Sequence, residues 1–456
     1  MGGPTRRAAA VAGVAVVLLV PAVGVASASG TTSAGLVVQT TDGVVQGIGT
    51  GTEAEWRGIP YAAPPVGALR WRPPQSVTPW SGVRDATQFT PPCIQTDFNG
   101  GTVGSEDCLH LNVFAPPAAT ARSGLPVMVH LHPGGNAYGS AYTDASAFTA
   151  RGIIVVTLDY RLGMFGFVGH PALSADQGGS SGEYGLLDQL AALRWVHDNI
   201  AAFGGDPANV TLFGSSAGSF DTVALMASPL SLGLITRAAV QGEVLWGLTG
   251  KFNMISDAEQ VGVQVAQQVG CQTAADVLAC LRATPAAALV EAAPTDLVPW
   301  VGGVVLPKSP LQSLSSGPRI PLLVGFDREE DGPFGYLPLT GKYTTNIWIR
   351  DTNALGGSPL GAQIRSLYPP NAYDALIWST VTAATDTKRG CPTRRLANTV
   401  SQGAPVWRYL YTHTYETIRF SLNSGRATSS KSRSSGGRTL ASVTSRRQQN
   451  SCCPSG

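Results

Sequence analysis

The feature that most constrains this chain is a Gly-x-Ser-x-Gly segment that runs from Gly214 to Gly218, with Ser216 at its centre. The β-branched, apolar run 209–212 before it predicts a buried strand, and the stretch 219–226 after it can continue as a helix. A serine on so sharp a turn has strained backbone angles, and only glycine on either side lets strand and helix pack this closely. The segment therefore indicates that Ser216 is a nucleophile. An ordinary Ser/Gly-rich loop is the alternative, because the motif alone is a weak match.

The rest of the chain alternates strand-like and helix-like stretches. Residues 37–48 alternate like an N-terminal hairpin, whereas 56–74, rich in proline and aromatic residues, is expected to be irregular but packed. Strands are predicted at 111–115, 127–132 and 153–159, and apolar residues at helical spacing predict a helix over 185–200. This alternation predicts an α/β fold with a mostly parallel central sheet and helices on both faces.

Composition and charge fit one large enzyme-sized domain. The chain has 456 residues, of which 43% are hydrophobic and 13% charged, which is enough for a single core over residues 29–417. The net charge of +2 indicates no nucleic-acid partner. Residues 418–456 differ from the rest, because they hold seven Lys or Arg, eleven Ser and no Asp or Glu. Such a basic, Ser-rich tail is expected to be disordered.

The N-terminus has the pattern of a secretory signal peptide. Arg6 and Arg7 form the basic region, residues 8–20 are apolar, and small residues at 26–28 form a cleavage site. We therefore expect residues 1–28 to be removed after Ala28 and the protein to be secreted. A membrane anchor is the alternative, but the apolar run is short for a membrane span, and no other stretch is suited to one.

Export permits disulfides. Cys93 and Cys108 bracket a short Gly-rich loop, and Cys271 and Cys280 bracket a short helical stretch, so two local bridges are expected. That pairing would leave Cys391 as a buried thiol. Metal binding is the competing interpretation of the cysteines, but no Cys-x-x-Cys or His-x-x-x-His spacing supports it, and we expect neither a metal nor a cofactor.

A second Gly-rich segment, His132-Pro133-Gly134-Gly135, follows a predicted strand. Glycine lets backbone N–H groups turn toward a substrate oxygen without a Cβ in the way. We expect the N–H groups of Gly134 and Gly135 to form an oxyanion hole together with that of Ala217, whereas Pro133 has no N–H to donate. An ordinary turn is the alternative.

Further segments resemble the type-B carboxylesterases, a family that includes carboxylesterases, cholinesterases and some lipases. The matching segments are Gly58-Ile59-Pro60-Tyr61-Ala62, Pro64-Pro65-Val66-Gly67, Glu106-Asp107-Cys108-Leu109, Asp159-Tyr160-Arg161-Leu162-Gly163, Tyr184-Gly185-Leu186-Leu187-Asp188-Gln189 and the run 199–207. The resemblance extends from about residue 37 to 413. It implies the α/β-hydrolase fold, a serine esterase that cleaves small-molecule esters through an acyl-enzyme, the two disulfides given above, and a structural ion pair between Arg70 and Glu106.

The same resemblance implies the acid of a catalytic triad. The family acid is the Glu of an Asn-x-Asp-Glu-Gly segment after a strand, and the run 321–332 fills that place here. The register from Gly325 selects Glu330. Its neighbours Glu329 and Asp331 are the alternatives, and any of the three could be an ordinary loop charge.

The chain departs from the family pattern in its histidines and near its nucleophile. Ser215 stands where the family usually has Glu, which removes a negative charge near the histidinium formed in catalysis and is expected to lower the rate. The catalytic histidine is not found. Five histidines belong to other motifs, and we do not expect His413, at the end of a predicted strand, to be the base. The six histidines are His110, His130, His132, His170, His197 and His413.

A reading-frame shift near Thr417 accounts for both the missing base and the tail composition. One permitted set of codons for residues 426–435, read in the shifted frame, gives Gly-His-Leu-Leu-Glu-Val-Pro-Phe-Val, which resembles the family's catalytic-histidine segment. A shift in the same direction over 447–455 gives a sequence that resembles the start of the family's C-terminal helix. The chain as printed is then expected to have little or no activity. The alternative function is a catalytically silent, cholinesterase-like binding protein, against which the presence of Ser216 argues.

Overall fold

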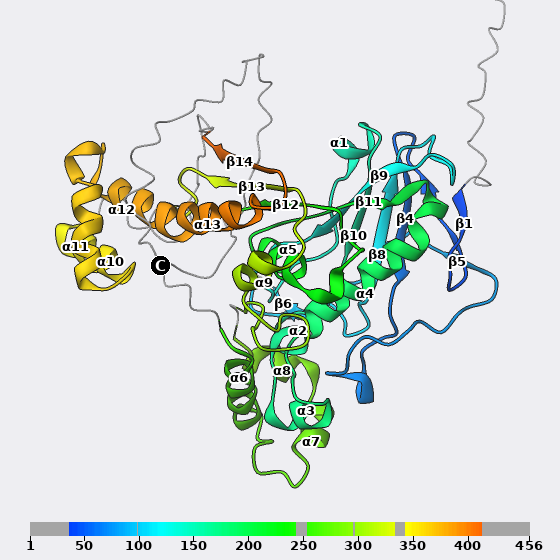
Figure 1. The fold of residues 1–456 in the computed structure, drawn as a ribbon. Coiled ribbons are helices and arrows are strands. Elements are labelled where there is room, and N and C mark those ends of the chain that lie inside the picture. The colour runs from blue at the N-terminus through cyan, green and yellow to red at the C-terminus, as the bar shows by residue number, and fades with distance from the viewer. Residues whose placement is uncertain (1–35, 98, 243–252, 295–296, 333–342, 413–456) are drawn as a thin grey trace, which may run out of the picture.

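The computed structural model describes residues 36–97, 99–242, 253–294, 297–332 and 343–412 of the chain. Its centre is a nine-stranded sheet in which the strands from β14 to β10 pair in parallel, while β8, β4 and β3 pair antiparallel (Figure 1). The α/β prediction with a mostly parallel central sheet is confirmed. In spatial order the strands are β14 (Val406–Tyr411), β13 (Leu322–Asp327), β12 (Arg237–Gln241), β11 (Gly205–Ser215), β9 (Leu125–Leu131), β10 (Ile154–Leu158), β8 (His110–Ala115), β4 (Ala54–Pro60) and β3 (Ile48–Gly49).

Smaller strands flank the large sheet. The expected N-terminal hairpin is formed by β1 (Val37–Gln39) and β2 (Val44–Gln46), and β5 (Val83–Asp85) joins it in parallel. A two-stranded ribbon consists of β6 (Gln95–Thr96) and β7 (Thr102–Val103).

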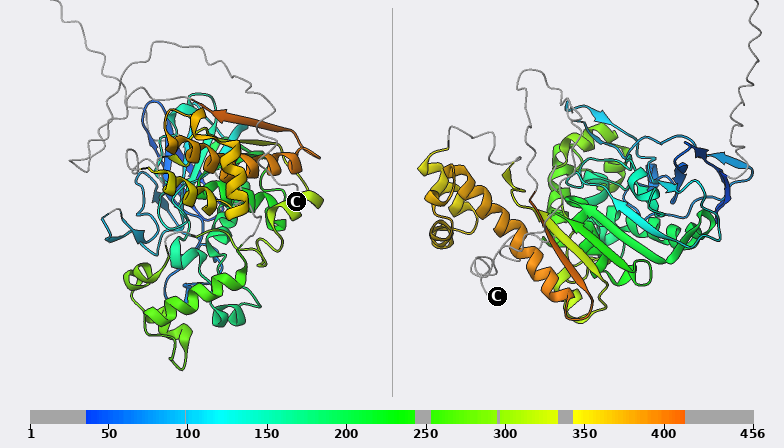
Figure 2. Two further views of the ribbon diagram at one scale, coloured as in Figure 1. Left: turned by 90° about the vertical axis from the view of Figure 1, so that its left-hand side faces the viewer. Right: turned by 90° about the horizontal axis from the view of Figure 1, so that it is seen from above.

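Helices pack against the central sheet. α5 contacts β9, β11 and β12, and α13 contacts β13 and β14. Figures 1 and 2 both show α10 and α11 apart from the sheet, joined to it through α12 and α13. The α-helices are α1 (Ser146–Thr149), α2 (Gly163–Phe167), α3 (Pro171–Asp176), α4 (Tyr184–Asn199), α5 (Ala217–Ala227), α6 (Ile255–Gln268), α7 (Val277–Ala283), α8 (Ala286–Ala292), α9 (Pro310–Ser316), α10 (Thr345–Ala354), α11 (Ser358–Leu367), α12 (Leu376–Thr385) and α13 (Cys391–Val400).

One expectation about the backbone was wrong. Residues 56–60, which we expected to be irregular, form most of β4. The strand carries a register shift against β8 between Trp56 and Ile59, and Gly58 between them has a φ of 68°. The sequence pattern did not predict this strand, because Gly58, with a positive φ, and the terminal Pro60 are residue types typical of bulges and edge strands.

The expected ion pair and disulfides are present. Arg70 Nη2 lies 2.6 Å from Glu106 Oε1, and both side chains are largely buried. The disulfides Cys93–Cys108 and Cys271–Cys280 are both formed. The expectation that Cys391 is a free thiol was wrong, because its sulfur is disulfide-bonded.

One face of the sheet at its β14 edge carries apolar side chains that remain in contact with solvent. Leu323 on β13 pairs in register with Trp407 on β14, and their side chains are 43% and 58% exposed. Tyr411, further along β14, is also exposed. Strands of parallel sheets are normally covered on both faces, so this bare face is unusual.

Several sequence predictions fall on residues that the structure does not describe. They are the signal peptide (1–28), His413 and the basic tail (418–456). In the described part of the chain no helix is long and apolar enough to cross a membrane, and no group of three or more His, Cys, Asp or Glu side chains is arranged to hold a metal ion.

Candidate active site

Ser216 lies at the turn between β11 and α5, at the carboxyl end of the central strands. Its backbone angles, φ 52° and ψ −122°, belong to a conformation that residues other than glycine rarely adopt. Ser216 is exposed, whereas the residues of α5 that follow it are buried. A strained, exposed serine on a strand-to-helix turn is the geometry expected of a nucleophile elbow.

The two glycines of the motif are required by close backbone contacts. A Cβ on Gly214 would lie 2.3 Å from the carbonyl oxygen of Gly218. A Cβ on Gly218 would lie 2.2 Å from the carbonyl oxygen of Leu131, at the end of β9. The turn can therefore form only with glycine at both positions, and it brings α5 directly against the end of β9.

The side chain of Ser219 fastens this turn to the next strand. Its Oγ lies 2.9 Å from the carbonyl oxygen of Gly214 and 2.6 Å from that of Gln241, and it accepts a hydrogen bond from the Gln241 N–H at 3.1 Å. Ser219 is fully buried. The elbow is thus tied to the end of β12 by a side chain that the sequence motif does not single out.

The Gly-rich segment lies beside the elbow. Leu131, the last residue of β9, pairs in register with Gly214 of β11, so the following loop starts next to Ser216. Gly134 and Gly135 have φ values of 128° and 61°. A Cβ on Gly134 would overlap the carbonyl oxygen of Tyr138, at 1.8 Å, so this loop conformation also depends on glycine.

The three expected oxyanion donors gather at this edge of the sheet. In the part of the chain that the structure describes, no intramolecular hydrogen bond uses the N–H groups of Gly134 and Gly135. Ala217 is the first residue of α5, and its N–H has no partner within the helix. All three groups are therefore available to a ligand oxygen, and the N-terminus of α5 favours a negative charge there.

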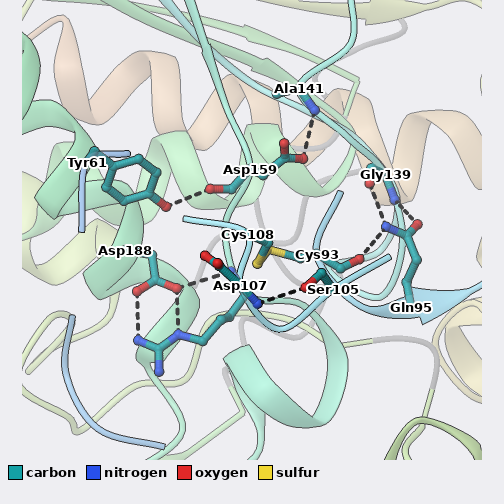
Figure 3. The surroundings of a disulfide bond; sticks show 11 residues. Tyr61, Cys93, Gln95, Ser105, Asp107, Cys108, Gly139, Ala141, Asp159 and Asp188 are labelled. Carbon is teal, nitrogen blue, oxygen red and sulfur yellow. Dashed lines mark hydrogen bonds and ion pairs between the residues drawn. A yellow bond between two sulfur atoms is a disulfide. The ribbon is translucent and has the colours of Figure 1, made fainter. Parts of the chain in front are cut away.

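The disulfide Cys93–Cys108 supports the far end of this loop (Figure 3). Gln95, two residues after Cys93, donates to the carbonyl oxygen of Gly139 at 2.8 Å and accepts from the Gly139 N–H at 2.7 Å. Figure 3 shows the paired hydrogen bonds between Gln95 and Gly139 next to the disulfide. The loop from 132 to 139 is thus held against the disulfide region.

Of the three candidate acids, Glu330 is the one whose carboxylate lies beside Gly242. Its Oε1 is 2.8 Å from the position that a Cβ on Gly242 would occupy, and Gly242 directly follows β12. Its Oε2 accepts from the Asp327 N–H at 2.8 Å. Burial raises the pKa of the Glu330 carboxyl, and the neighbouring carboxylates of Asp327 and Asp331 raise it further.

The other two carboxylates have partners of their own. Glu329 is half-buried and pairs with Arg328 at 2.9 Å. Asp331 is buried and accepts from Lys388 at 3.4 Å and from Arg389 at 3.3 Å. Both carboxylates are therefore engaged in ion pairs away from the elbow, which favours the choice of Glu330 within the run 329–331.

The described histidines lie in other elements of the fold, except His132, which begins the Gly-rich loop beside the elbow. His110 begins β8, His130 lies in β9, and His170 caps α3 by accepting from the Ala172 N–H. Burial lowers the pKa of His130 and of His132 to about 4, so both are neutral at pH 7. His197 is exposed on α4 beside Asp198. Among the described residues, no histidine is hydrogen-bonded to Ser216 or Glu330.

Sequence reasoning missed a buried polar cluster behind the Gly-rich loop. Asp221 on α5 is fully buried, and its carboxylate accepts from Asn136 Nδ2 at 3.1 Å and from Gln189 Nε2 at 2.6 Å. Burial raises the pKa of Asp221 to about 7, although these two hydrogen bonds lower it. The available signal was a single carboxylate within an apolar helix, which indicates a partner somewhere in the core.

The fold is of the α/β-hydrolase class, and the comparisons with known proteins agree with this class. The model of the Carboxylesterase family matches residues 34–433. The chain therefore belongs to the carboxylesterase family. The match continues past Thr417 into the segment of aberrant composition.

Individual relatives are carboxylic ester hydrolases. The chain is 39% identical over 316 residues to the fumonisin B1 esterase of Sphingopyxis macrogoltabida, with 66% of this chain and 57% of that protein covered. It is 34% identical over 392 residues to the para-nitrobenzyl esterase of Bacillus subtilis, with 82% and 78% covered. A solved PNB esterase structure superposes with a TM-score of 0.71 at 34% identity, with 84% of this chain and 82% of that one covered. The matched region thus spans less than two thirds of the fumonisin B1 esterase.

Proposed function

We propose that this chain is a secreted serine carboxylesterase that cleaves small-molecule esters through an acyl-enzyme on Ser216. The observation that carries the proposal is the strained backbone of Ser216, at φ 52°, beside a Gly-rich loop that begins at the end of β9. An exposed serine keeps a strained backbone only when the surrounding structure holds it there, and such strained residues are typical of active sites, catalytic nucleophiles included.

The proposed reaction has two steps. Ser216 Oγ attacks the ester carbonyl carbon while a base takes its proton, and the carbonyl oxygen becomes an oxyanion that accepts hydrogen bonds from Gly134, Gly135 and Ala217. The C–O bond to the alcohol then breaks, and the alcohol leaves with the proton. Water attacks the acyl-enzyme in the same way, which releases the acid and restores the serine.

Glu330 is the proposed orienting acid, because its carboxylate lies next to the backbone at Gly242, one residue after the Gln241 carbonyl that accepts from Ser216. The base is absent from the described residues. We attribute this to a frameshift near Thr417 that replaced the histidine-bearing segment. Without a base, only the weak catalysis of the oxyanion hole and of substrate binding remains.

Two chains test the proposal, the chain as printed and one whose reading frame is restored at the Thr417 codon. Hydrolysis of p-nitrophenyl butyrate and covalent labelling by a fluorophosphonate are measured for both, with Ser216→Ala as the control. We expect fast, Ser216-dependent turnover only in the restored chain. Rapid Ser216-dependent turnover by the printed chain would show that its base is present and that the frameshift hypothesis is wrong.

A catalytically silent binding protein is the second candidate, and it is favoured by one observation: no described histidine is bonded to Ser216. Failure of the restored chain both to hydrolyse the ester and to react with the fluorophosphonate would support it. Secretion is tested separately by sequencing the N-terminus of exported protein, for which we expect Ser29 as the first residue.

A further inference from the structure

We propose that Asp221 is a positioning residue that holds the oxyanion loop in place through Asn136. This inference rests on the proposed serine mechanism, since it assigns a role to a residue that supports the same site. Asp221 touches neither substrate nor nucleophile in this arrangement. It acts on the backbone that carries the donors.

The first step is the contact between α5 and the loop. Asp221 Oδ1 accepts from Asn136 Nδ2 at 3.1 Å, across 85 residues of sequence, and both side chains are fully buried. Asn136 directly follows Gly135. A buried hydrogen bond to a carboxylate is stronger than a neutral one, so this contact fixes the side chain of Asn136 firmly.

The second step is the conformation of Asn136 itself. Its φ of 55° lies in the left-handed region, which costs free energy for a residue with a side chain. Its carbonyl oxygen accepts from the Gly163 N–H at 2.7 Å, so the loop in this conformation reaches the first residue of α2. The Asp221 contact offsets that cost by binding the side chain of the strained residue.

Tyr160 holds the opposite end of the same loop. Its hydroxyl donates to the carbonyl oxygen of His132 at 2.9 Å and lies 3.5 Å from Asn136 Oδ1. His132 and Asn136 flank the two glycines. The backbone of Gly134 and Gly135 is therefore held from both sides, with Asp221 on one side and Tyr160 on the other.

The third step concerns α5. Asp221 lies one turn beyond Ala217, the residue that provides the third donor. The contact to Asn136 therefore joins the helix that carries one donor to the loop that carries the other two. Relative placement of the three donors matters, because a displacement of about 1 Å in an active site can reduce a rate by about a hundredfold.

The buried position of the Asp221 carboxylate also lowers the stability of the fold. Its side-chain partners Asn136 and Gln189 are neutral amides, and among the described residues no ion pair involves Asp221. Burial is the main cause of its raised pKa. An unpaired buried carboxylate destabilises the fold, so a purely structural role is better served by an apolar side chain. A costly group that contacts the oxyanion loop is consistent with a functional role.

Hydrogen exchange of the full chain tests the inference without requiring turnover. Exchange of peptides covering residues 131–139 is measured in Asp221→Ala, Asp221→Asn and Gln189→Leu. The rate of fluorophosphonate labelling is measured for the same three variants made in the frame-restored chain. We expect Asp221→Ala to speed exchange in this loop by about tenfold and to slow labelling by about tenfold to a hundredfold.

The other two variants separate positioning from general stability. Asp221→Asn should behave as wild type, because Gln189 Oε1 is buried without a partner and can turn to accept from the new amide, while the Asn136 contact persists. Gln189→Leu removes the other partner of Asp221 and should lower the melting temperature but leave exchange in the loop unchanged. Equal acceleration by Gln189→Leu, or no acceleration by Asp221→Ala, would overturn the inference.

A double-mutant cycle adds an independent criterion. Asn136→Gly retains the left-handed backbone but removes the side chain that Asp221 holds. If Asp221 acts through Asn136, Asp221→Ala should have almost no further effect on loop exchange in that background, and additive effects would contradict the inference. Absence of labelling in the frame-restored chain would count against the proposed function, whereas the exchange data decide the role of Asp221 in either case.

Discussion

The backbone N–H of Ser216 donates to the carbonyl oxygen of Gln241 at 3.1 Å. This bond connects the elbow to the last residue of β12, and the next residue, Gly242, lies against the carboxylate of Glu330. The proposed nucleophile and the proposed acid are thus related through the end of one strand. Their separation is set by the spacing of β11, β12 and β13 rather than by the loops alone.

Replacing Ser216 by glycine or by alanine should separate the effect of its backbone strain on stability from the effect of losing its hydroxyl on labelling. Both variants lose fluorophosphonate labelling, but only glycine relieves the unfavourable φ of 52°. We expect Ser216→Gly to be more stable than Ser216→Ala by about 1 kcal/mol in denaturant unfolding. As a control, Ser215→Gly, at an ordinary strand position, should lower stability. Equal stability of the glycine and alanine variants would mean that the elbow stores no strain.

Glu330→Gln should lower activity and raise stability. In the frame-restored chain we expect kcat for p-nitrophenyl butyrate to fall by about a thousandfold or more, because the base loses its orienting carboxylate. Burial raises the pKa of Glu330 in the folded state, so ionised Glu330 costs stability and the amide should increase the melting temperature at pH 8. Glu329→Gln is the matched control and should change neither quantity greatly. If kcat falls more in Glu329→Gln than in Glu330→Gln, Glu330 is not the orienting acid.

Asp159 should make stability fall as pH rises. Burial raises the pKa of its carboxyl to about 8, although the Ala141 N–H donates to it at 2.9 Å. The unfolded chain releases this proton near pH 4, whereas the folded chain retains it to about pH 8. The folded state therefore binds more protons between these values, and stability decreases with pH across that window.

Asp159→Asn removes this dependence. We expect the variant to equal the wild type near pH 4 and to exceed it by more than about 1 kcal/mol at pH 8. Thermal unfolding at a series of pH values measures the difference, and Asp198→Asn, at an exposed position, serves as the control. A difference that does not grow between pH 5 and pH 8 would show that Asp159 does not titrate in this window.

The two disulfides should differ in their effect on the site. Removal of either by Cys→Ala pairs should cost about 3 kcal/mol of stability, because each bridge restricts the unfolded chain. Only removal of Cys93–Cys108 should also slow Ser216 labelling, because Gln95 joins that region to Gly139. The Cys271–Cys280 pair is the control, and equal slowing of labelling in both variants would indicate general loosening.

Local patterns predicted the elements whose identity depends on near neighbours. The β-branched run at β10 predicted a buried strand, and all five of its residues are buried. The elbow and the Gly-rich loop were equally visible, because both require glycine at fixed spacing. The strand β4 was missed because Gly58 interrupts its alternation.

The support of the site could not be predicted in the same way. Asp221 and Asn136 are 85 residues apart, and only the parallel order of β9 and β11 brings them together. No local pattern contains that pairing. The contact between Glu330 and Gly242 has the same origin, since it arises from the adjacency of β12 and β13. Resemblance to a family selected Glu330, whereas composition and periodicity did not.

The exposed apolar face at the β14 edge should affect how the purified protein behaves in solution. Trp407 on β14, the edge strand of the described sheet, and Leu323 on the adjacent strand β13 present neighbouring apolar side chains to water. Such an edge is a template for pairing with another chain. Purified protein should therefore self-associate as its concentration increases and should enhance the fluorescence of a hydrophobic dye. The variant Trp407→Lys should remain monomeric at the same concentrations. In the unaltered chain, the fluorescence emission of Trp407 itself should report the self-association, because the environment of its indole ring changes.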